Sequence, residues 1–197
     1  MNDSIIELKK KMKKVLDRDR YQHTLGVAYT AASLAMRYNL DIDKAFTAGL
    51  LHDCAKCIPN DEKLRLCKKF GIQLTDAEKN VPSLTHAKLG ACLAEKEYGV
   101  TDPDILAAVR THTTGAPGMS RLQEIIFMAD YIEPNRNTAP NLKEVRSLCF
   151  NNPAIAIRKI LSDTLQYLNK RKDSAIDPAT KDTYDYYKNE TEKVEWV

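Results

Sequence analysis

The segment Leu50-Leu51-His52-Asp53-Cys54-Ala55-Lys56 sets a histidine beside an aspartate within an apolar stretch that has helical spacing. Asp53 follows Gly49 and Leu50 by one helical turn, so its carboxylate is expected to point inward. A buried carboxylate without partners costs several kcal/mol or takes up a proton, so buried acids are normally paired or bound to metal. This segment therefore predicts a helix that carries a functional acid.

The remaining histidines and one further aspartate have similar surroundings. The chain has four histidines, and each lies within or at the end of an apolar helical stripe, while Asp130 follows Ile126 by one turn. A single such histidine is more often a core residue bonded to the backbone. Together they suit a divalent cation such as Fe, Mn, Co, Ni or Zn, and they are numerous enough for two ions bridged by one aspartate. The predicted metal ligands are His23, His52, Asp53, His86, His112 and Asp130.

Three glycines accompany these residues. Gly26 lies three residues after His23, Gly49 lies four before Asp53, and Gly90 lies four after His86. Glycine inside a helix costs about 1 kcal/mol relative to alanine, and it allows neighbouring backbones to approach closely. Ordinary tight packing would explain the glycines, but not their position beside the histidines and aspartates.

Cationic and hydroxyl side chains near the predicted ligands favour an anionic substrate. Lys56 lies one turn after His52, Arg136 follows Asp130 in a loop rich in Pro and Asn, and Thr113 and Thr114 follow His112. A bound metal ion lowers the pKa of water from about 15.7 toward about 7 and polarises phosphoryl oxygens. Arg136 is suited to a phosphate group and Lys56 to developing negative charge, although Lys56 also fits a solvated helix end.

Hydrophobic spacing of three and four residues runs through the whole chain, and no alternating stretch is long enough to predict a sheet. We expect an all-α fold, a compact bundle of about ten helices. Asp102 before Pro103, Asn152 before Pro153, and Ser120 with Gln123 are typical helix starts. We expect one domain over residues 1–197, with the motifs in 18–136 and C-terminal helices in 141–197.

Composition argues against several classes of protein. The net charge is +3, and the 30 basic residues are interleaved with 27 acidic ones, which does not favour nucleic acid as a partner. The basic stretch from Lys9 to Lys14 reads as the solvated flank of an amphipathic helix with Ile5, Ile6, Leu8, Met12, Val15 and Leu16 on its apolar face. No stretch is apolar for long enough to span a membrane, and five scattered cysteines indicate reduced thiols. We expect a cytoplasmic protein.

The stretch around His52-Asp53, together with the order of the other histidines and of Asp130, resembles the HD-domain metal phosphohydrolase superfamily. The resemblance implies that His23, His52, Asp53 and Asp130 hold one iron, and that Asp53, His86 and His112 face a second metal or the phosphate. We predict catalytic roles for Asp53, Lys56, His86 and His112.

A narrower resemblance is carried by Arg20-Tyr21-Gln22-His23-Thr24-Leu25-Gly26-Val27, Thr85-His86-Ala87-Lys88-Leu89-Gly90-Ala91, Thr111-His112-Thr113-Thr114-Gly115 and Ala129-Asp130-Tyr131-Ile132-Glu133-Pro134-Asn135-Arg136. Together these segments are similar to the YqeK-type symmetrical bis(5'-nucleosyl)-tetraphosphatases of bacteria. The resemblance implies hydrolysis of diadenosine tetraphosphate to two ADP by a metal-activated hydroxide, with one or two iron ions in the site. It implies phosphate contacts from Lys56, His86, His112, Thr113 and Arg136. We expect His23 and Asp130 to contact the substrate as well. We also predict that the ring of Tyr187 stacks on an adenine of the substrate. The alternative is that Tyr187 covers the hydrophobic core.

Other interpretations stay open at this stage. Cys54-Ala55-Lys56-Cys57 has the spacing of a redox or zinc motif, but it has no second pair and overlaps the predicted helix. The same metal site also suits a nucleoside monophosphate or a cyclic nucleotide as substrate. A nucleotide-binding sensor without turnover is a third reading, and an apolar helix face is compatible with a homodimer.

Overall fold

The computed structural model describes residues 3–171 and 176–194, and within these residues it consists of helices and connecting turns without a strand. The all-α prediction is therefore confirmed. The helices are α1 (Asp3–Val15), α2 (Arg18–Arg37), α3 (Ile42–Leu51), α4 (Asn60–Lys69), α5 (Asp76–Asn80), the 3-10 helix η1 (Pro82–Thr85), α6 (His86–Lys96), α7 (Pro103–Thr111), α8 (Arg121–Ile132), α9 (Leu142–Asn151), α10 (Pro153–Lys170) and α11 (Pro178–Val194).

The three predicted helix starts are confirmed. Asp102 and Asn152 accept backbone N–H groups at the starts of α7 and α10, each with proline as the first helical residue. Ser120 and Gln123 form a reciprocal capping box at the start of α8. These caps satisfy backbone donors that the first helical turn leaves without partners.

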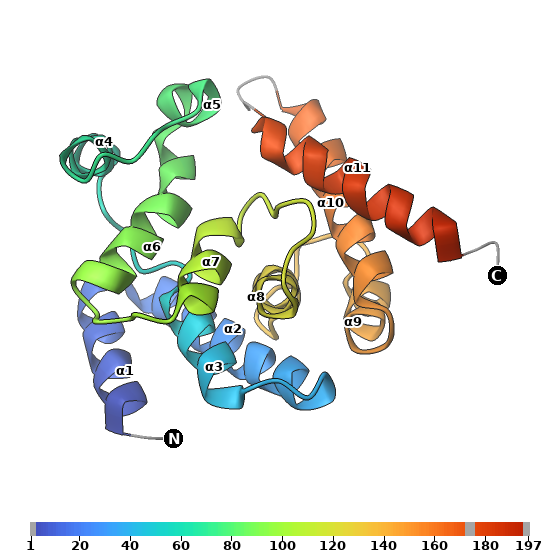
Figure 1. Ribbon diagram of the computed structural model, residues 1–197, viewed down its shortest axis with the longest axis horizontal. Coiled ribbons are helices and arrows are strands. Elements are labelled where there is room, and N and C mark those ends of the chain that lie inside the picture. Colours follow the sequence, from blue (N-terminus) through green and yellow to red (C-terminus); the bar gives the residue numbers. More distant parts are fainter. Residues whose placement is uncertain (1–2, 172–175, 195–197) are drawn as a thin grey trace.

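Helix α8 forms the centre of the molecule. Its buried residues lie on several sides of the helix and include Ile125, Ile126, Phe127 and Met128. A helix that is apolar around most of its circumference must be covered by neighbours on most sides. Figure 1 shows α8 near the middle, with α2, α3 and α7 on one side and α9 and α10 on the other. Asp130 therefore reaches the interior from the last turn of the central helix.

The α2–α3 pair depends on Gly49. A Cβ atom on Gly49 would lie 2.8 Å from the Cα atom of Ala28, a distance at which the two backbones would have to move apart. Gly90 differs, because a Cβ atom there would lie 3.4 Å from the Cys54 sulfur, which is an ordinary contact. The expected link between glycine and close backbone approach is confirmed at Gly49 and does not apply to Gly90.

The helix predicted through His52-Asp53 ends earlier than expected. α3 stops at Leu51, and the chain then makes successive tight turns, in which the N–H groups of Cys54, Lys56 and Ile58 donate to carbonyls three residues earlier. The prediction that Lys56 extends from a continuing helix was wrong. Lys56 reaches the site from a turn, whose shape depends on tertiary contacts that the local sequence does not show.

The N-terminal helix α1 is amphipathic, as predicted, with a narrower apolar face. Ile5, Leu8 and Met12 are buried, whereas Ile6 and Val15 are 44% and 45% exposed. Their assignment to the apolar face was therefore wrong. The helix packs against the protein through a single stripe.

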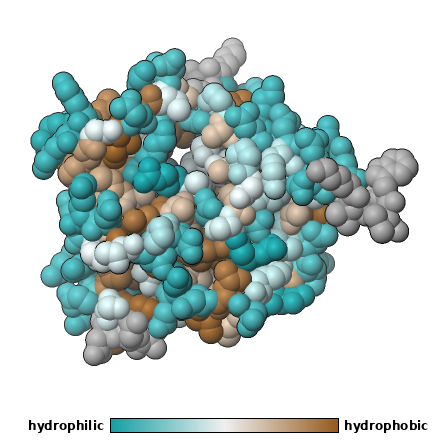
Figure 2. All heavy atoms as spheres, in the orientation of Figure 1, coloured by the Kyte–Doolittle hydropathy of each residue, from teal (hydrophilic) through white to brown (hydrophobic). Residues whose placement is uncertain are grey.

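The surface agrees with the reading of the composition. Figure 2 shows hydrophilic residues along most of the outline of this face, with hydrophobic residues gathered at the upper left and in the lower middle. None of the helices in the described part of the chain is long and apolar enough to cross a bilayer. All five cysteines are free thiols, and Cys54 donates to the Gly90 carbonyl inside the core, so the Cys54–Cys57 pair does not form a disulfide.

Candidate metal centre

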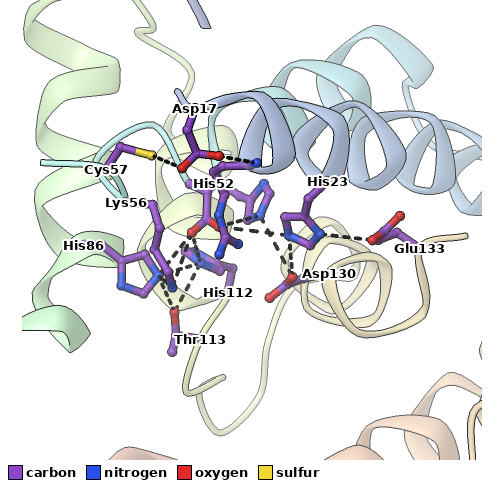
Figure 3. A network of polar contacts seen from close by, with 12 residues as sticks. Asp17, His23, His52, Lys56, Cys57, His86, His112, Thr113, Asp130 and Glu133 are labelled. Carbon is purple, nitrogen blue, oxygen red and sulfur yellow. Dashed lines mark hydrogen bonds and ion pairs between the residues drawn. The ribbon is translucent and has the colours of Figure 1, made fainter. Parts of the chain in front are cut away.

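The four histidines and Asp130, which we predicted as metal ligands, converge at one place between the helices (Figure 3). Asp53, the sixth predicted ligand, lies among them. His23 lies in the second turn of α2, and Asp130 lies in the last turn of α8. His52 and His112 are the residues that follow α3 and α7, and His86 begins α6. Most of these side chains thus project from helix ends, where the backbone has spare hydrogen-bonding groups.

Three of the histidines are fixed by the same local hydrogen bond. The Nδ1 atoms of His52, His86 and His112 lie 2.7, 2.6 and 2.8 Å from the carbonyl oxygens of the residues three positions earlier. A carbonyl oxygen only accepts, so each Nδ1 carries the hydrogen and donates it. In the neutral ring, Nε2 then holds a lone pair that faces the centre, which is the form that binds a metal ion.

His23 is oriented by a carboxylate instead of a carbonyl. Its Nδ1 lies 3.1 Å from Oε1 of Glu133, which is 1% exposed. Its Nε2 faces Asp130 Oδ1 at 3.1 Å without forming a hydrogen bond. All four rings thus turn Nδ1 outward to an acceptor and Nε2 inward to a shared space.

Asp53 lies in the middle of the group, with its two oxygens on opposite sides. Oδ2 is 3.5 Å from His52 Nε2 and 4.0 Å from His23 Nε2. Oδ1 is 3.2 Å from His86 Nε2 and 3.5 Å from His112 Nε2. A carboxylate with one oxygen toward each of two nitrogen groups has the arrangement required to bridge two cations.

The inward-facing nitrogen and oxygen atoms are better placed to bind cations than to form hydrogen bonds with one another. His23 Nε2, His52 Nε2 and Asp53 Oδ1 are buried and have no hydrogen-bond partner among the described residues. The Nε2 atoms of His86 and His112 are 3.2 Å apart, so their lone pairs repel unless a proton or a cation lies between them. Two overlapping groups have ligand atoms within 4.8 Å of one another, namely His23, His52 and Asp130, and His52, Asp53 and His112.

Electrostatics keeps Asp53, Asp130 and His86 in the protonation states that bind metal. Burial alone would raise the pKa values of Asp53 and Asp130, but the surrounding histidines, and Arg136 beside Asp130, hold both well below the usual range. Burial lowers the pKa of His86 to about 4, outweighing the opposing effect of Asp53. The two carboxylates are therefore ionised and His86 is neutral at pH 7, as metal ligation requires.

The predicted substrate-contact residues are near this centre, with one exception. Lys56 Nζ lies 3.1 Å from His86 Nε2, and the Thr113 hydroxyl lies 3.2 Å from the same nitrogen. Arg136 donates from Nη2 to Asp130 Oδ1 at 2.8 Å. These cations and hydroxyls border the centre on the sides of both His86 and Asp130.

Tyr187 is the exception, and its expected contact with adenine is a correction. The residue is 2% exposed, and its hydroxyl donates to Glu124 Oε1 at 2.8 Å in the core. A ring that is enclosed and bonded in this way has no free face on which a base can stack. The alternative weighed above, a tyrosine that belongs to the core, describes Tyr187 correctly.

Two residues of the centre were absent from the predicted site. Arg20 donates from Nη1 to Asp53 Oδ2 at 2.8 Å, and Glu133 orients His23. Each lies three residues from a predicted ligand, Arg20 before His23 and Glu133 after Asp130. That helical spacing was the signal available in the sequence, and it does not by itself separate these residues from ordinary surface charges.

Comparisons with known proteins agree with this geometry. The family model described as HD domain matches residues 20–135. A Bacillus subtilis protein named "Bis(5'-nucleosyl)-tetraphosphatase, symmetrical" is 40% identical over 89% of this chain and 92% of its own length. A Staphylococcus aureus protein of the same name is 32% identical over 97% of this chain and 98% of its own.

A solved structure gives the same result for the fold. It is titled as a predicted HD superfamily hydrolase involved in NAD metabolism from Clostridium acetobutylicum. It superposes with a TM-score of 0.89 at 34% sequence identity, covering 94% of this chain and 97% of that one. The chain therefore belongs to the HD domain family, in the group that includes the proteins named symmetrical bis(5'-nucleosyl)-tetraphosphatases.

Proposed function

We propose that this protein is a metal-dependent hydrolase that cleaves diadenosine tetraphosphate symmetrically into two ADP. Relatives with 32–41% identity over most of both chains carry the corresponding name. The observation that carries the proposal is the position of Asp53, whose two oxygens face separate groups of histidine nitrogens. A site for two bridged cations is well suited to a phosphoric anhydride.

The donor set fits one or two iron ions, with Mn, Co, Ni or Zn as substitutes. His23, His52, Asp53 and Asp130 would hold the first ion, and Asp53, His86 and His112 would hold the second. When bound, such ions activate water and polarise phosphoryl oxygens. The protein supplies imidazole rings that are fixed by hydrogen bonds, and two ionised carboxylates, for these ions.

The cations around the centre suit a long polyphosphate bound across it. Lys56 lies on the His86 side, and Arg136 lies beside Asp130. Arg20 adds a third cation next to Asp53. With cations on both sides, the bridge between the second and third phosphates can lie over the metal centre, and Thr113 can donate to a phosphoryl oxygen. Cleavage at that bridge gives two identical halves.

The decisive experiment loads the protein with ferrous iron under anaerobic conditions, adds diadenosine tetraphosphate and separates the products by anion exchange. ADP as the only product supports the proposal. Asp53→Ala should release metal and abolish hydrolysis with helical content intact, whereas the exposed Asp61→Ala should behave as wild type. Full activity of Asp53→Ala would contradict the assignment.

The same assay separates the other functions. ATP together with AMP would preserve a metal hydrolase with a different cleavage position, and turnover only of a nucleoside monophosphate or cyclic nucleotide would change the substrate class. Nucleotide-dependent thermal stabilisation without product would indicate a sensor. A cytoplasmic location, a single domain over residues 1–197 and a homodimer stay predictions from the sequence.

A further inference from the structure

One arginine in α9 holds the segment that follows α8. Arg146 donates from Nε to the Ile132 carbonyl at 3.0 Å, and from Nη2 to the carbonyls of Glu133 and Arg136 at 3.1 and 2.8 Å. The Ile132 carbonyl is the last of α8, where the helix supplies no partner for it, and the Glu133 carbonyl follows directly. A single planar guanidinium thus fixes residues 132–136 against α9.

The side chain of Glu133 links this fixed backbone segment to His23, one of the predicted metal ligands. Its Oε1 lies 3.1 Å from His23 Nδ1, and its Oε2 accepts the Asn135 N–H at 2.8 Å. The carboxylate is therefore held on both oxygens and presents one of them to His23. Carboxylates that orient a histidine in this way fix the ring and raise its basicity toward metal.

Gly26 provides the space for that carboxylate. A Cβ atom on Gly26 would lie 2.3 Å from Oε2 of Glu133, which is too close for any real contact. The lack of a side chain at Gly26, one turn after His23, thus leaves room for the Glu133 carboxylate. It does not bring two helix backbones close together, as we had expected for this glycine. The sequence pattern had predicted a role beside the ligand, and the structure assigns it to this contact.

Arg136 depends on the same fixed segment. Its Nε donates to the Asp130 carbonyl at 3.1 Å and its Nη2 to Asp130 Oδ1 at 2.8 Å, while its own carbonyl is held by Arg146. Its backbone N–H donates to the Glu133 carbonyl at 3.0 Å. The side chains at both ends of this short turn thus reach residues of the metal centre.

We propose that Arg146 is a positioning residue that fixes residues 132–136 so that Glu133 orients His23 for metal and Arg136 is directed to the substrate phosphates. The part that concerns Arg136 rests on the proposed function, whereas the part that concerns metal does not. The hydrogen bonds of Arg146 described above go to the backbone of residues 132–136 and not to His23 or Asp130.

The first test is Mn²⁺ affinity, measured by isothermal titration calorimetry on protein freed of metal. Glu133→Gln and Arg146→Lys should each weaken binding by about 10- to 100-fold, the usual effect of losing a group that orients a ligand. Lysine keeps the charge of Arg146 but lacks the planar fork that reaches several carbonyls. Arg37→Lys is the matched control, because Arg37 Nε also donates to a carbonyl, that of Phe150 at 2.8 Å, away from the centre. It should bind Mn²⁺ as wild type does.

The double variant separates positioning from general stability. If Arg146 acts through Glu133, the combined loss in Arg146→Lys/Glu133→Gln should be clearly smaller than the product of the two single losses. Multiplicative losses would mean that the two residues act independently, and would overturn the proposal. If Arg146→Lys loses its helical signal, the Glu133→Gln variant is used instead to decide the part that concerns metal. Wild-type Mn²⁺ affinity in Glu133→Gln would mean that Glu133 does not orient His23 for metal, and would overturn the proposal.

The second test uses kinetics with diadenosine tetraphosphate at saturating metal. Arg146→Lys should raise KM, because Arg136 is displaced, whereas the control Arg37→Lys should have a KM close to wild type. An unchanged KM in Arg146→Lys would overturn the part that concerns Arg136. If wild type itself shows no turnover, the proposed function fails, and the Mn²⁺ measurements still decide the part that concerns metal.

Discussion

His52, His86 and His112 show how much of a metal centre is decided by single residues. Each donates its Nδ1 hydrogen to the carbonyl three residues earlier, so the reactive nitrogen is selected by the local backbone. The sequence predicted which residue types gather, because buried histidines and aspartates require partners. It did not predict which ring atom faces inward, since that depends on the backbone conformation at helix ends. Arg20 and Glu133 were missed for a related reason, because their roles arise from contacts across the fold.

Gly26→Ala tests the space beside Glu133. The added methyl group would meet Oε2 and displace the carboxylate from His23, so Mn²⁺ affinity should fall by about 10-fold or more. Gly90→Ala is the matched control, because it also lies one turn from a histidine and its methyl group has room. It should bind metal normally and gain up to about 1 kcal/mol of helix stability. Equal metal affinities in the two variants would contradict the role of Gly26.

His86 should make the metal-free protein sensitive to acid. Its pKa is about 4 in the folded protein against an ordinary value of 6.5, so between these values the unfolded chain binds a proton that the folded chain does not. Stability should fall as pH falls through this window, by on the order of 3 kcal/mol. His23 acts in the opposite direction because its pKa is raised: burial alone would lower it, but Asp130 and Glu133 outweigh this effect.

Urea unfolding of wild type and His86→Gln, with metal chelated, isolates this contribution. The difference in unfolding free energy between the two proteins should change between pH 4.5 and 6.5, with wild type gaining relative stability as pH rises. His23 is common to both proteins and cancels. Parallel curves over this range would show that His86 is not held neutral.

Among the elements, the helix starts were predictable and the end of α3 was not. Asp102, Asn152 and Ser120 cap their helices through local hydrogen bonds, and a local rule is enough to find them. The residues between His52 and Ile58 have no glycine or proline before Pro59, so nothing local ends the helix at Leu51. The turns are fixed by distant groups, since Cys54 donates to the Gly90 carbonyl and Cys57 to Asp17.

Gly49→Ala tests the packing of α2 on α3. Its methyl group would meet the backbone of Ala28, and relief requires the two helices to separate. We expect a loss of about 1–3 kcal/mol in unfolding free energy, measured by urea denaturation. The loss should be accompanied by weaker Mn²⁺ binding, because these helices hold His23 and His52. Gly90→Ala again serves as the control, and a stable Gly49→Ala protein with normal metal affinity would mean that the helices adapt without moving the ligands.

For the whole molecule, an ion bound at this centre would join α2, α6, α8 and the turns that follow α3 and α7. Adding Mn²⁺ at about 100 times its Kd to protein that a chelator has freed of metal should raise the unfolding free energy by about 2.7 kcal/mol. This corresponds to a Tm increase on the order of 5–10 °C. Hydrogen exchange should slow around the five histidine- and aspartate-bearing segments and stay unchanged in α4, which supplies none of them. Asp53→Ala should lose both effects. A shift of similar size in that variant would place the stabilising ion elsewhere.

The all-helical class and approximate helix number could be predicted from periodicity, because that pattern is repeated along the entire chain. For the six predicted ligand residues, the sequence predicted that they gather, but not where or how they meet. Their spacing of up to 107 positions between His23 and Asp130 has no local signature, and the meeting point depends on how α8 is enclosed. The failed prediction for Tyr187 has the same origin, since the chain alone does not show which tyrosines of α11 face the core.

The outward hydrogen bonds of the four rings also affect how metal enters and leaves. Ordering a buried side chain costs on the order of 1 kcal/mol of conformational entropy, and here the rings are already ordered by acceptors outside the centre. Ion binding then requires little rearrangement of the chain, and folding does not have to wait for the ion. We expect the metal-free protein to be folded already, and to take up its ion without a folding step.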